Sequence, residues 1–467
     1  MTSPRTTLPV RLVGDGLPVP CLDGERPSIS LDAAASTAAL PSVADRVTEF
    51  VPWYSSVHRG AGFKSQGATV AYEHARDDAL RFAGRVPREG RDDVAIICRN
   101  TTEAINHLAY RLQLDRDDVV LTTVVEHHAN LLPWGRLATR RYVECGAEGT
   151  FTVDAVRAGL TAEPRPKLLA ITGASNVTGW LPPIDEIVDV AHELDVPVFV
   201  DAAQLAPHRP LPAEADFVAW SGHKMYAPYG AGALVGAARV FRVGDPFLAG
   251  GGAVDLVDLD EVVWTDPPER EEAGSPNVIG AVAMAAAIEA LEDIGWDAIL
   301  EHEHERELAT RLKGGLAAID GVRLLGPGAD EPTLAVAAFV VDAVPHALVA
   351  ARLSAEFGIA TRHGCFCAHP YLLRLLDLDE GEVQRYRDAV LRGDRREVPG
   401  AVRASASIAT TVEEIDAFLE AVRGIAAGDP PPVAYEQDEH TGDWHPVGDI
   451  PGWSADDRRV GASCARG

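Results

Sequence analysis

The stretch Asp-Phe-Val-Ala-Trp-Ser-Gly-His-Lys at residues 216–224 decides the fold of this chain. Its first half is a short apolar run of the kind that forms a buried strand, and its second half brings a hydroxyl, an imidazole and an amine to the end of that strand. An earlier apolar run at 197–200 ends in Asp201, and Gln204 follows. Because an open α/β sheet gathers polar groups at one edge, we expect these side chains to lie close together.

The chemistry of these side chains predicts a pyridoxal 5′-phosphate (PLP) enzyme. Lys224 carries an amine that can bond to the aldehyde of the cofactor, and Ser221 and His223 can hold its phosphate. Asp201 can keep the pyridine nitrogen protonated, so that the ring accepts the electrons left when a bond to the substrate Cα breaks. An acid that only caps a helix is the alternative for Asp201, and the nearby Gln204 and Lys224 weigh against it. The residues therefore predict carbanion chemistry on an amino acid.

Apolar runs that alternate with helical patterns predict an α/β fold with a mostly parallel sheet. The expected strands lie at 93–98, 118–122, 167–172, 197–200, 217–220 and 231–235. Apolar residues recur at helical spacing over 184–194 behind two prolines, which predicts a crossover helix. These elements form the expected large domain, residues 29–285, behind an N-terminal arm of residues 1–28.

After about residue 285 the alternation of apolar runs with helical patterns gives way to the order helix, strand, helix. An alanine-rich helix is expected to continue to about residue 312, followed by a strand at 334–341 and an amphipathic helix at 413–425. This order predicts a smaller α+β domain, residues 286–427, that closes over the large one. Residues 428–467 are rich in Pro, Gly, Asp and His without periodicity, so an irregular tail is expected.

The composition excludes several classes of protein. A net charge of −28 argues against a surface that binds nucleic acid or anionic membranes. No run approaches the ~20 apolar residues needed to cross a bilayer, and residues 1–16 lack the apolar core of a signal peptide. The six cysteines, at 21, 98, 145, 365, 367 and 464, do not form a disulfide framework. These observations predict a cytoplasmic protein without nucleic-acid or membrane partners.

Further cofactor ligands are expected after other strands. Thr101 and Thr102 begin a helical pattern, where a phosphate would meet free backbone N–H groups and two hydroxyls; a simple N-cap by Thr101 is the alternative. His127 can stack on the pyridine ring, although a lone histidine at a strand end is more often structural. Asn176 can bind the phenolate oxygen of the cofactor, and a plain turn is the alternative there.

Together these motifs resemble the class V, fold-type I PLP-dependent enzymes, and within them the cysteine desulfurase and selenocysteine lyase group. The resemblance extends over about residues 29–426. The segments that carry it lie at 31–36, 57–60, 101–103, 126–130, 176, 201–204 and 221–224. A homodimer is implied.

The resemblance also implies roles for single residues. Lys224 is the catalytic lysine that holds PLP, Asp201 pairs with the pyridinium, and His127 stacks on the ring. Gln204 and Asn176 contact the phenolic oxygen, and Asn176 and His58 are expected beside the substrate. The implied phosphate ligands are Thr102 with the adjacent Thr101, then Ser221, His223 and, across a dimer interface, Ser275, where the family usually has threonine.

Arg362 and Cys367 stand five positions apart, as the arginine and the nucleophilic cysteine do in this family. In that role a Cys367 thiolate takes the sulfur of a bound cysteine, which leaves alanine and a persulfide on the enzyme. The Gly-Cys-Phe-Cys motif at 364–367 also resembles the desulfurase part of molybdenum cofactor sulfurases, and Cys365 is an addition relative to most desulfurases. In a strand-like loop both thiols share one face, so both can approach the cofactor, but only Cys367 keeps the five-residue offset from Arg362 and is predicted to carry the sulfur.

Two alternatives remain for this segment. His363, Cys365, Cys367 and His369 carry zinc-binding groups, but one-residue spacings fit tetrahedral coordination poorly, so no metal site is predicted. The thiols can also be buried packing groups.

Arg403 is predicted to grip the substrate carboxylate bidentately, with Arg362 as the second candidate. It lies farther beyond Cys367 than in most desulfurases, because residues 371–399 form an insertion that is expected at the mouth of the site. The expected activity is that of a cysteine desulfurase acting on L-cysteine or a thio-conjugate, with a possible sulfur-acceptor protein. An aminotransferase, an epimerase, a C–S lyase and an inactive scaffold subunit remain alternatives.

Overall fold

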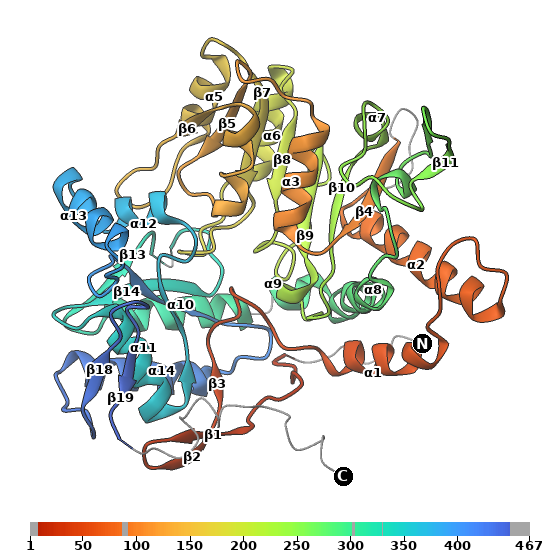
Figure 1. Cartoon of the computed structure of the whole chain (residues 1–467). Coiled ribbons are helices and arrows are strands. Elements are labelled where there is room, and N and C mark those ends of the chain that lie inside the picture. The colour runs from red at the N-terminus through yellow and green to blue at the C-terminus, as the bar shows by residue number, and fades with distance from the viewer. Residues whose placement is uncertain (1–7, 86–91, 301–303, 329, 449–467) are drawn as a thin grey trace.

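A seven-stranded sheet forms the centre of the computed structural model, which describes residues 8–85, 92–300, 304–328 and 330–448 (Figure 1). Its strands are β4 (Asp93–Cys98), β5 (Val119–Thr123), β6 (Thr139–Val143), β7 (Pro166–Thr172), β8 (Val198–Asp201), β9 (Phe217–Ser221) and β10 (Gly232–Ala237). They are ordered β4-β10-β9-β8-β7-β5-β6, and within this sheet β10 alone runs opposite to the other six strands. The predicted α/β class and strands are confirmed, whereas β6 was not expected.

Successive side chains of these strands point to opposite faces of the sheet, and each face is covered by its own apolar layer. Phe199 packs with residues of α3 (Thr101–Arg111) on one face. Val198 and Val200 belong to the core on the other face, with residues of α5 (Val153–Thr161) and α6 (Ile184–Glu193). The α6 helix is the predicted crossover helix. The helices α1 (Pro41–Phe50), α2 (Phe63–Phe82) and α8 (Val278–Ile294) pack together below the sheet in Figure 1.

A second, four-stranded antiparallel sheet lies beside the first (Figure 1). Its strands, in spatial order, are β13 (Val322–Leu325), β14 (Val336–Val341), β17 (Ala401–Ser405) and β16 (Arg362–Gly364). A separate apolar cluster joins it to α10 (His304–Ala317), α11 (His346–Phe357) and α14 (Val412–Ala426). The N-terminal segment joins this half, because β3 (Ile29–Ser30) pairs with β15 (Ile359–Ala360). The α+β character of this half agrees with the expectation, and the exact domain limits stay a prediction.

Two expectations about the second half were wrong. The alanine-rich helix does not run to residue 312: α8 ends at Ile294, because Gly295 has a φ of +86° that a continuing helix cannot accept, and α9 (Trp296–Leu300) starts anew. The tail from residue 428 is not irregular throughout, because β18 (Tyr435–Gln437) and β19 (Trp444–Pro446) form a hairpin. The rest of the expected tail, 449–467, and residues 1–7 of the expected arm lie outside the described residues.

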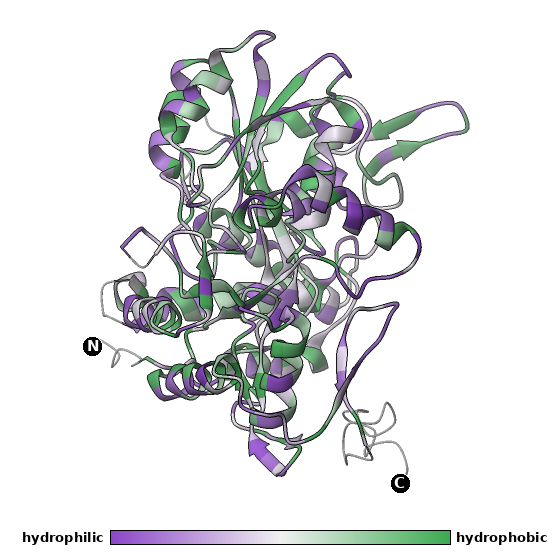
Figure 2. Cartoon of the chain, turned by 90° about the vertical axis from the view of Figure 1, so that its left-hand side faces the viewer, coloured by the Kyte–Doolittle hydropathy of each residue, from purple (hydrophilic) through white to green (hydrophobic). Residues whose placement is uncertain are grey.

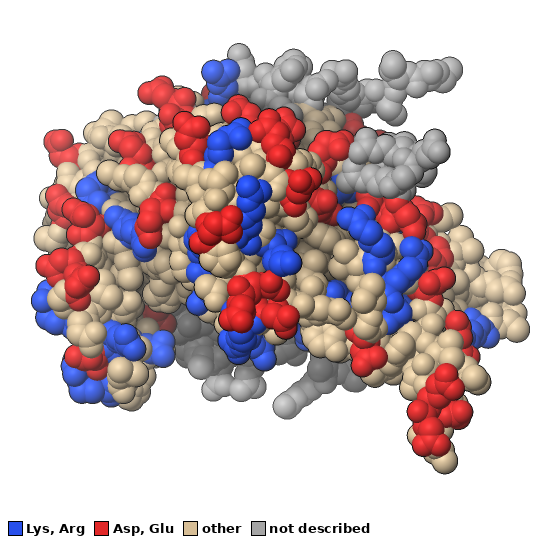
Figure 3. Space-filling model, turned by 90° about the horizontal axis from the view of Figure 1, so that it is seen from above, with Lys and Arg blue, Asp and Glu red and all other residues tan. Residues whose placement is uncertain are grey.

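The remaining short elements lie at the periphery. The N-terminal arm forms a hairpin of β1 (Pro18–Cys21) and β2 (Gly24–Pro27), and the predicted insertion carries α12 (His369–Leu375) and α13 (Glu380–Leu391). A hairpin of β11 (Val254–Val257) and β12 (Val262–Trp264) projects from the body with apolar strands (Figure 2), and acidic side chains gather at its tip (Figure 3). Within the described part of the chain, no helix has the length and apolar character to span a bilayer.

Candidate active site

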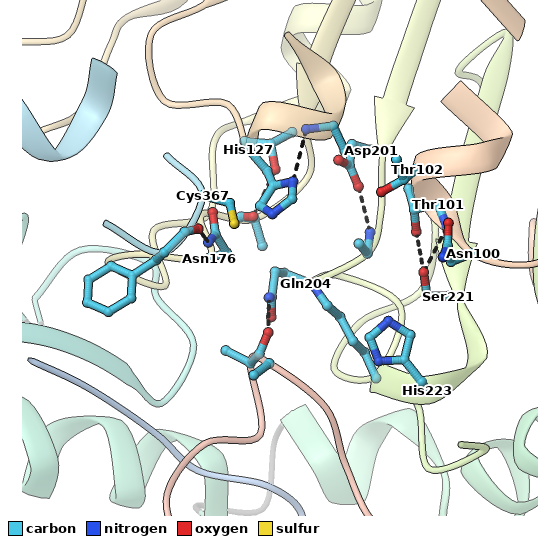
Figure 4. A pocket seen from close by; sticks show the side chains of 18 of the residues that line it. Asn100, Thr101, Thr102, His127, Asn176, Asp201, Gln204, Ser221, His223 and Cys367 are labelled. Atoms are coloured by element: carbon cyan, nitrogen blue, oxygen red, sulfur yellow. Dashed lines mark hydrogen bonds between the residues drawn. The ribbon is translucent and has the colours of Figure 1, made fainter. Parts of the chain in front are cut away.

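A cavity of about 320 Å³ lies where the carboxyl ends of the large sheet face the second sheet. It is lined by most of the predicted site residues, from both sheets (Figure 4). These are Thr101, Thr102, His127, Asn176, Asp201, Gln204, Ser221, His223, Lys224, Arg362, Cys367 and Arg403. The cavity therefore brings together side chains that lie far apart in the sequence.

Lys224 and Asp201 face each other across neighbouring strands. Asp201 ends β8 and is buried, and one of its oxygens accepts a hydrogen bond from the Ala203 N–H at 3.0 Å. Burial raises the pKa of Asp201, against the effects of Ala203 and of the Lys224 charge. Lys224 ends the short 3₁₀ turn after β9, and burial lowers its pKa to about 8 while Asp201 acts in the opposite direction. About a tenth of this amine is therefore neutral and nucleophilic at pH 7, far more than in an ordinary lysine.

The start of α3 forms an anion-binding end of the cavity. Ser221 Oγ accepts a hydrogen bond from the Thr101 N–H at 2.8 Å and lies 2.7 Å from Thr101 Oγ1, so this pair is fixed. Thr102 is exposed and lines the cavity with its hydroxyl. The expected alternative, an N-cap by Thr101, was wrong: Asn100 is the cap, and its Oδ1 accepts from the Glu103 N–H at 3.0 Å. The N–H of Thr102 in the first turn of α3 and the hydroxyls of this segment suit a phosphate.

His127 is held in one neutral form beside Lys224. Its Nδ1 accepts a hydrogen bond from the Ala129 N–H at 3.0 Å, which leaves the ring proton on Nε2 (Figure 4). Burial, and after it the Lys224 charge, lower the pKa of His127 to about 3. A neutral imidazole on the cavity wall can stack on a heterocycle and exchange a proton with a substrate.

Asn176 and Gln204 are amide groups that also hold loops in place. Asn176 Nδ2 donates to the Phe366 carbonyl at 2.8 Å, and Gln204 Nε2 donates to the Ala34 carbonyl at 2.6 Å. One N–H of each side chain is thereby used to hold a segment of the second half against the large sheet. Both residues line the cavity, so their role as cofactor ligands stays a prediction.

Arg403 is buried in the cavity wall that faces the large sheet. Its guanidinium donates to the Asn176 carbonyl at 2.9 Å and to Asp32 Oδ1 at 3.0 Å, and lies 5.2 Å from the Phe366 ring centre. Arg403 Nε is buried and has no partner among the described residues. The exposed Arg362 pairs with the same Asp32 carboxylate at 2.8 Å. The two arginines therefore flank one carboxylate already, and a substrate carboxylate can take its place.

Two acidic residues of this site were missed. Asp32 joins the two arginines, although the sequence shows it only as part of an N-terminal motif. Glu126 is fully buried and accepts hydrogen bonds from Thr123 Oγ1 at 2.7 Å, from Asn130 Nδ2 at 2.7 Å and from the Thr172 N–H at 3.1 Å. Burial raises the pKa of Glu126 to about 8. Glu126 thus holds the backbone next to His127 in place. The sequence signal that could have revealed this role is an acid directly before two histidines.

The loop that carries the two cysteines is a tight turn. Phe366 and Cys367 both have a φ of +54°, a left-handed conformation that is rare for residues other than glycine. Cys367 is exposed and lines the cavity, whereas Cys365 is partly buried and does not line it. The expectation that both thiols share a face was wrong, because the turn replaces the strand-like alternation.

The zinc-binding alternative finds no support in the positions of its residues. His363 pairs with Asp443 at 3.3 Å, and the His369 ring stacks on that of His128 with centres 5.0 Å apart. Each ring thus already has a partner other than a thiol. Across the described ranges, no three His, Cys, Asp or Glu side chains are grouped to hold a metal ion.

Two predicted residues lie outside the cavity of this chain. His58 Nε2 lies 3.0 Å from Glu73 Oε1, and Ser275 is exposed on the loop before α8. Neither lines the cavity, so a single chain does not bring them to the site.

The arrangement is that of a PLP-type site: a lysine facing a buried acid on neighbouring strands, with an anion site at a helix start. Comparisons with known proteins agree. The aminotransferase class-V family model matches residues 29–418. A probable cysteine desulfurase from Halobacterium salinarum is 34% identical over 407 residues, which are 84% of this chain and 90% of that protein. Probable cysteine desulfurase 2 from Mycobacterium leprae is 34% identical over 409 residues, with the same shares of both chains.

Solved structures show the same relationship. The apo cysteine desulfurase of Thermococcus onnurineus superposes with a TM-score of 0.75 at 31% identity, covering 86% of this chain and 95% of that one. The cysteine desulfurase CsdA of Escherichia coli gives 0.71 at 31% identity, with the same coverage. The chain belongs to the aminotransferase class-V family of PLP-dependent enzymes, within its cysteine desulfurase group.

Proposed function

We propose that this protein binds PLP and removes sulfur from L-cysteine, giving alanine and a persulfide on Cys367. The observation that carries the proposal is that the exposed Cys367 thiol, the amine of Lys224 and the buried guanidinium of Arg403 line one cavity. The reaction balances without an external oxidant, because L-cysteine and the Cys367 thiol become alanine and a Cys367 persulfide.

The cavity fits the cofactor. Asp201 is a buried carboxylate at one end, and the start of α3 with Ser221 is an anion site at the other. Lys224 has a pKa of about 8, so more of its amine is neutral and able to bond to an aldehyde than in an ordinary lysine. When bound, PLP supplies an electron sink for bonds at the Cα of an amino acid.

The substrate would be positioned by its carboxylate. Arg403 offers a buried Nε without a partner among the described residues, and its two other nitrogens bind Asn176 and Asp32. A substrate carboxylate that displaces Asp32 would gain a charge-assisted contact with the buried guanidinium. That anchor directs the rest of the amino acid toward Lys224 and Cys367.

Protons would be handled by Lys224 and His127. Both groups are mostly or partly neutral near pH 7, because burial lowers the pKa of each. Lys224 can take a proton from the substrate Cα, and His127 Nε2–H can give one to the departing part of the substrate. Cys367 takes the sulfur as the nucleophile, because its thiol lines the cavity.

A second copy of the chain is part of the proposal. His58 and Ser275 are exposed or half-exposed and do not reach the cavity of their own chain. Exposed apolar side chains around α2 and the β11–β12 hairpin, such as Phe63 and Leu256, offer a surface that a second copy can cover. In a homodimer, His58 and Ser275 would complete the partner's site. A cytoplasmic location is also proposed, since the described cysteines are free thiols.

The test is to supply L-cysteine to the PLP-loaded protein and to measure alanine, sulfide and pyruvate. Alanine equal to the sulfide released by a reducing thiol supports the proposal, and Lys224→Ala should abolish both. Cys367→Ser should stop alanine formation, while Cys145→Ser, at a partly buried thiol outside the cavity, serves as the matched control. Pyruvate in place of alanine, or full activity in Cys367→Ser, would favour a C–S lyase instead.

A further inference from the structure

The turn that presents Cys367 to the cavity depends on contacts from outside the turn. Phe366 and Cys367 are left-handed in succession, a conformation that costs energy for residues other than glycine. The Phe366 carbonyl accepts from Asn176 Nδ2 at 2.8 Å, and the Cys367 carbonyl accepts from the His128 N–H at 2.7 Å. A costly backbone of this kind persists only where its surroundings hold it. Removal of one of these contacts should therefore loosen the turn.

His128 holds this segment at two points. Its backbone N–H donates to the Cys367 carbonyl, and its ring Nε2 accepts from the His369 backbone N–H at 3.2 Å. His369 is the first residue of α12, so its N–H has no acceptor within that helix. The two bonds lie on either side of Ala368. One residue that follows β5 thus fixes both the end of the turn and the start of the helix behind it.

The second of these bonds defines the protonation state of His128. A backbone N–H can only donate, so His128 Nε2 carries no proton and the ring proton lies on Nδ1. His369 Nδ1 lies 3.2 Å from the same Nε2, so it donates as well. The two rings are parallel, with an angle of 2° between their planes and centres 5.0 Å apart. A proton on His128 Nε2 would meet these two donors and remove their acceptor.

The surroundings of His128 keep its ring neutral. Burial, and after it the charge of His369, lower the pKa of His128. The adjacent His127 ring, with its centre 6.3 Å away, is neutral as well. Of the elements packed here, α3 carries Glu103, His107 and Arg111, β7 carries Lys167, and α12 carries Arg374. None of these five groups acts on the pKa of His128. The half-buried ring can still take a proton from solvent.

We propose that His128 is a positioning residue, whose neutral imidazole holds the Cys367 turn at the cavity and releases that turn when Nε2 is protonated. This inference rests on the proposed desulfurase function for the role of Cys367 as the sulfur acceptor. The held turn excludes a proton from His128 Nε2, and the released turn accepts one. The turn is therefore held above the ordinary histidine pKa of 6.5, and its stability is lost progressively as the pH falls below that value.

Backbone hydrogen exchange tests this role without turnover. The protein without PLP is exchanged at several values from pH 5 to pH 8, and mass spectrometry gives the protection of residues 366–372 relative to an unstructured chain. We expect this protection to fall below about pH 6.5, by up to about tenfold per pH unit, because one proton is taken up when the turn is released. Protection of β7 and β9 reports whether the fold is intact. Protection of 366–372 that does not change with pH overturns the proposal.

Two variants of His128 separate its acceptor from its titration. His128→Gln offers an amide oxygen that does not titrate, so protection of 366–372 should stay high from pH 8 to pH 5. His128→Leu offers no acceptor, so protection should be about tenfold lower at pH 8, as expected for one lost hydrogen bond. His192→Gln, at an exposed histidine paired with Asp216, is the matched control and should behave like the native protein.

Two outcomes of this comparison overturn the proposal. The first is a native pH response in His128→Gln, and the second is native protection in a folded His128→Leu. If His128→Leu fails to fold, as loss of protection in β7 and β9 would show, the profile of His128→Gln decides alone.

The PLP-loaded protein connects the turn to the reaction. At pH 8, His128→Leu should lower kcat for alanine formation about tenfold relative to His192→Gln, with KM for L-cysteine changed less than about twofold, because the anchor at Arg403 is untouched. Equal kcat in the two variants, or a change confined to KM, overturns the positioning of Cys367 and leaves the desulfurase intact. No alanine from the native protein would reject the desulfurase, while hydrogen exchange still decides whether His128 holds the turn.

Discussion

The amine of Lys224 should titrate far below an ordinary lysine in the protein without cofactor. Burial lowers its pKa from 10.5 to about 8, a shift worth about 3 kcal/mol of lost preference for the charged form. At pH 8 about half of this amine is neutral, against about 0.3% for a lysine of pKa 10.5, which is a roughly 150-fold gain in reactive amine. Replacing Asp201 with Asn should move the midpoint lower still, because the Asp201 charge favours the protonated amine.

The assay is competitive labelling with trace acetic anhydride from pH 6 to pH 11, followed by peptide mass spectrometry. The chain has only four lysines, at 64, 167, 224 and 313, so every site can be followed separately. The exposed Lys64 and Lys167 are references at each pH. Lys224 labelling should reach half of its plateau near pH 8 in the native protein and at a lower pH in Asp201→Asn. A Lys224 curve that follows Lys64 and Lys167 would refute the reasoning.

Three further changes have definite expected outcomes. Arg403→Lys should weaken amino-acid binding about 10- to 100-fold, as expected for a lost charge-assisted contact of about 1.5–3 kcal/mol, with unchanged visible absorbance of bound PLP; equal affinity in titrations would move the anchor elsewhere. Lys313 is buried without a carboxylate partner, and burial lowers its pKa to about 7. The unfolded chain therefore binds an extra proton between pH 7 and 10, and stability should rise with pH there; Lys313→Met should flatten that rise in urea unfolding, and an unchanged slope would contradict the assignment. Gly179→Ala should cost about 2 kcal/mol or more in the free energy of unfolding, because Gly179 has a φ of +74° and a Cβ would lie 2.8 Å from the Leu334 carbonyl; a melting temperature within a degree of the native value would show that the contact relaxes.

Strands and helices could be predicted from the sequence where a short segment carries the whole pattern. Strands such as β7 and β9 are continuous apolar runs, because both of their faces are covered, and their ends mark the site. The edge strand β6 was missed because its Thr-Arg-Arg-Tyr segment is only partly buried and lacks an apolar run. The break at Gly295 lay within a sequence of high helix propensity and was missed for that reason.

Some of the site residues could be predicted from the sequence, and others could not. Polar groups at strand ends, such as Asp201 and Lys224, were located because the fold class states where strand ends meet. Asp32 and Glu126 were missed because their roles depend on partners that are distant in the sequence or buried beneath the site. The divergence of Cys365 and Cys367 depends on two left-handed residues, which the residue types at those positions do not predict.

The pairing of the first segments with the last has a consequence for synthesis on the ribosome. Strand β4 contacts the large sheet only through β10, and β3 must wait for β15, which lies far later in the chain. In the emerging N-terminal third, β4 thus lacks a strand partner until β10 is made, and the faces of α1 and α2 that contact α8 stay uncovered until α8 is made. Such contacts between distant segments form late and leave apolar surface open to other chains in the meantime. We therefore expect nascent chains that stop before α8 to be retained by chaperones or degraded, rather than released as a folded half.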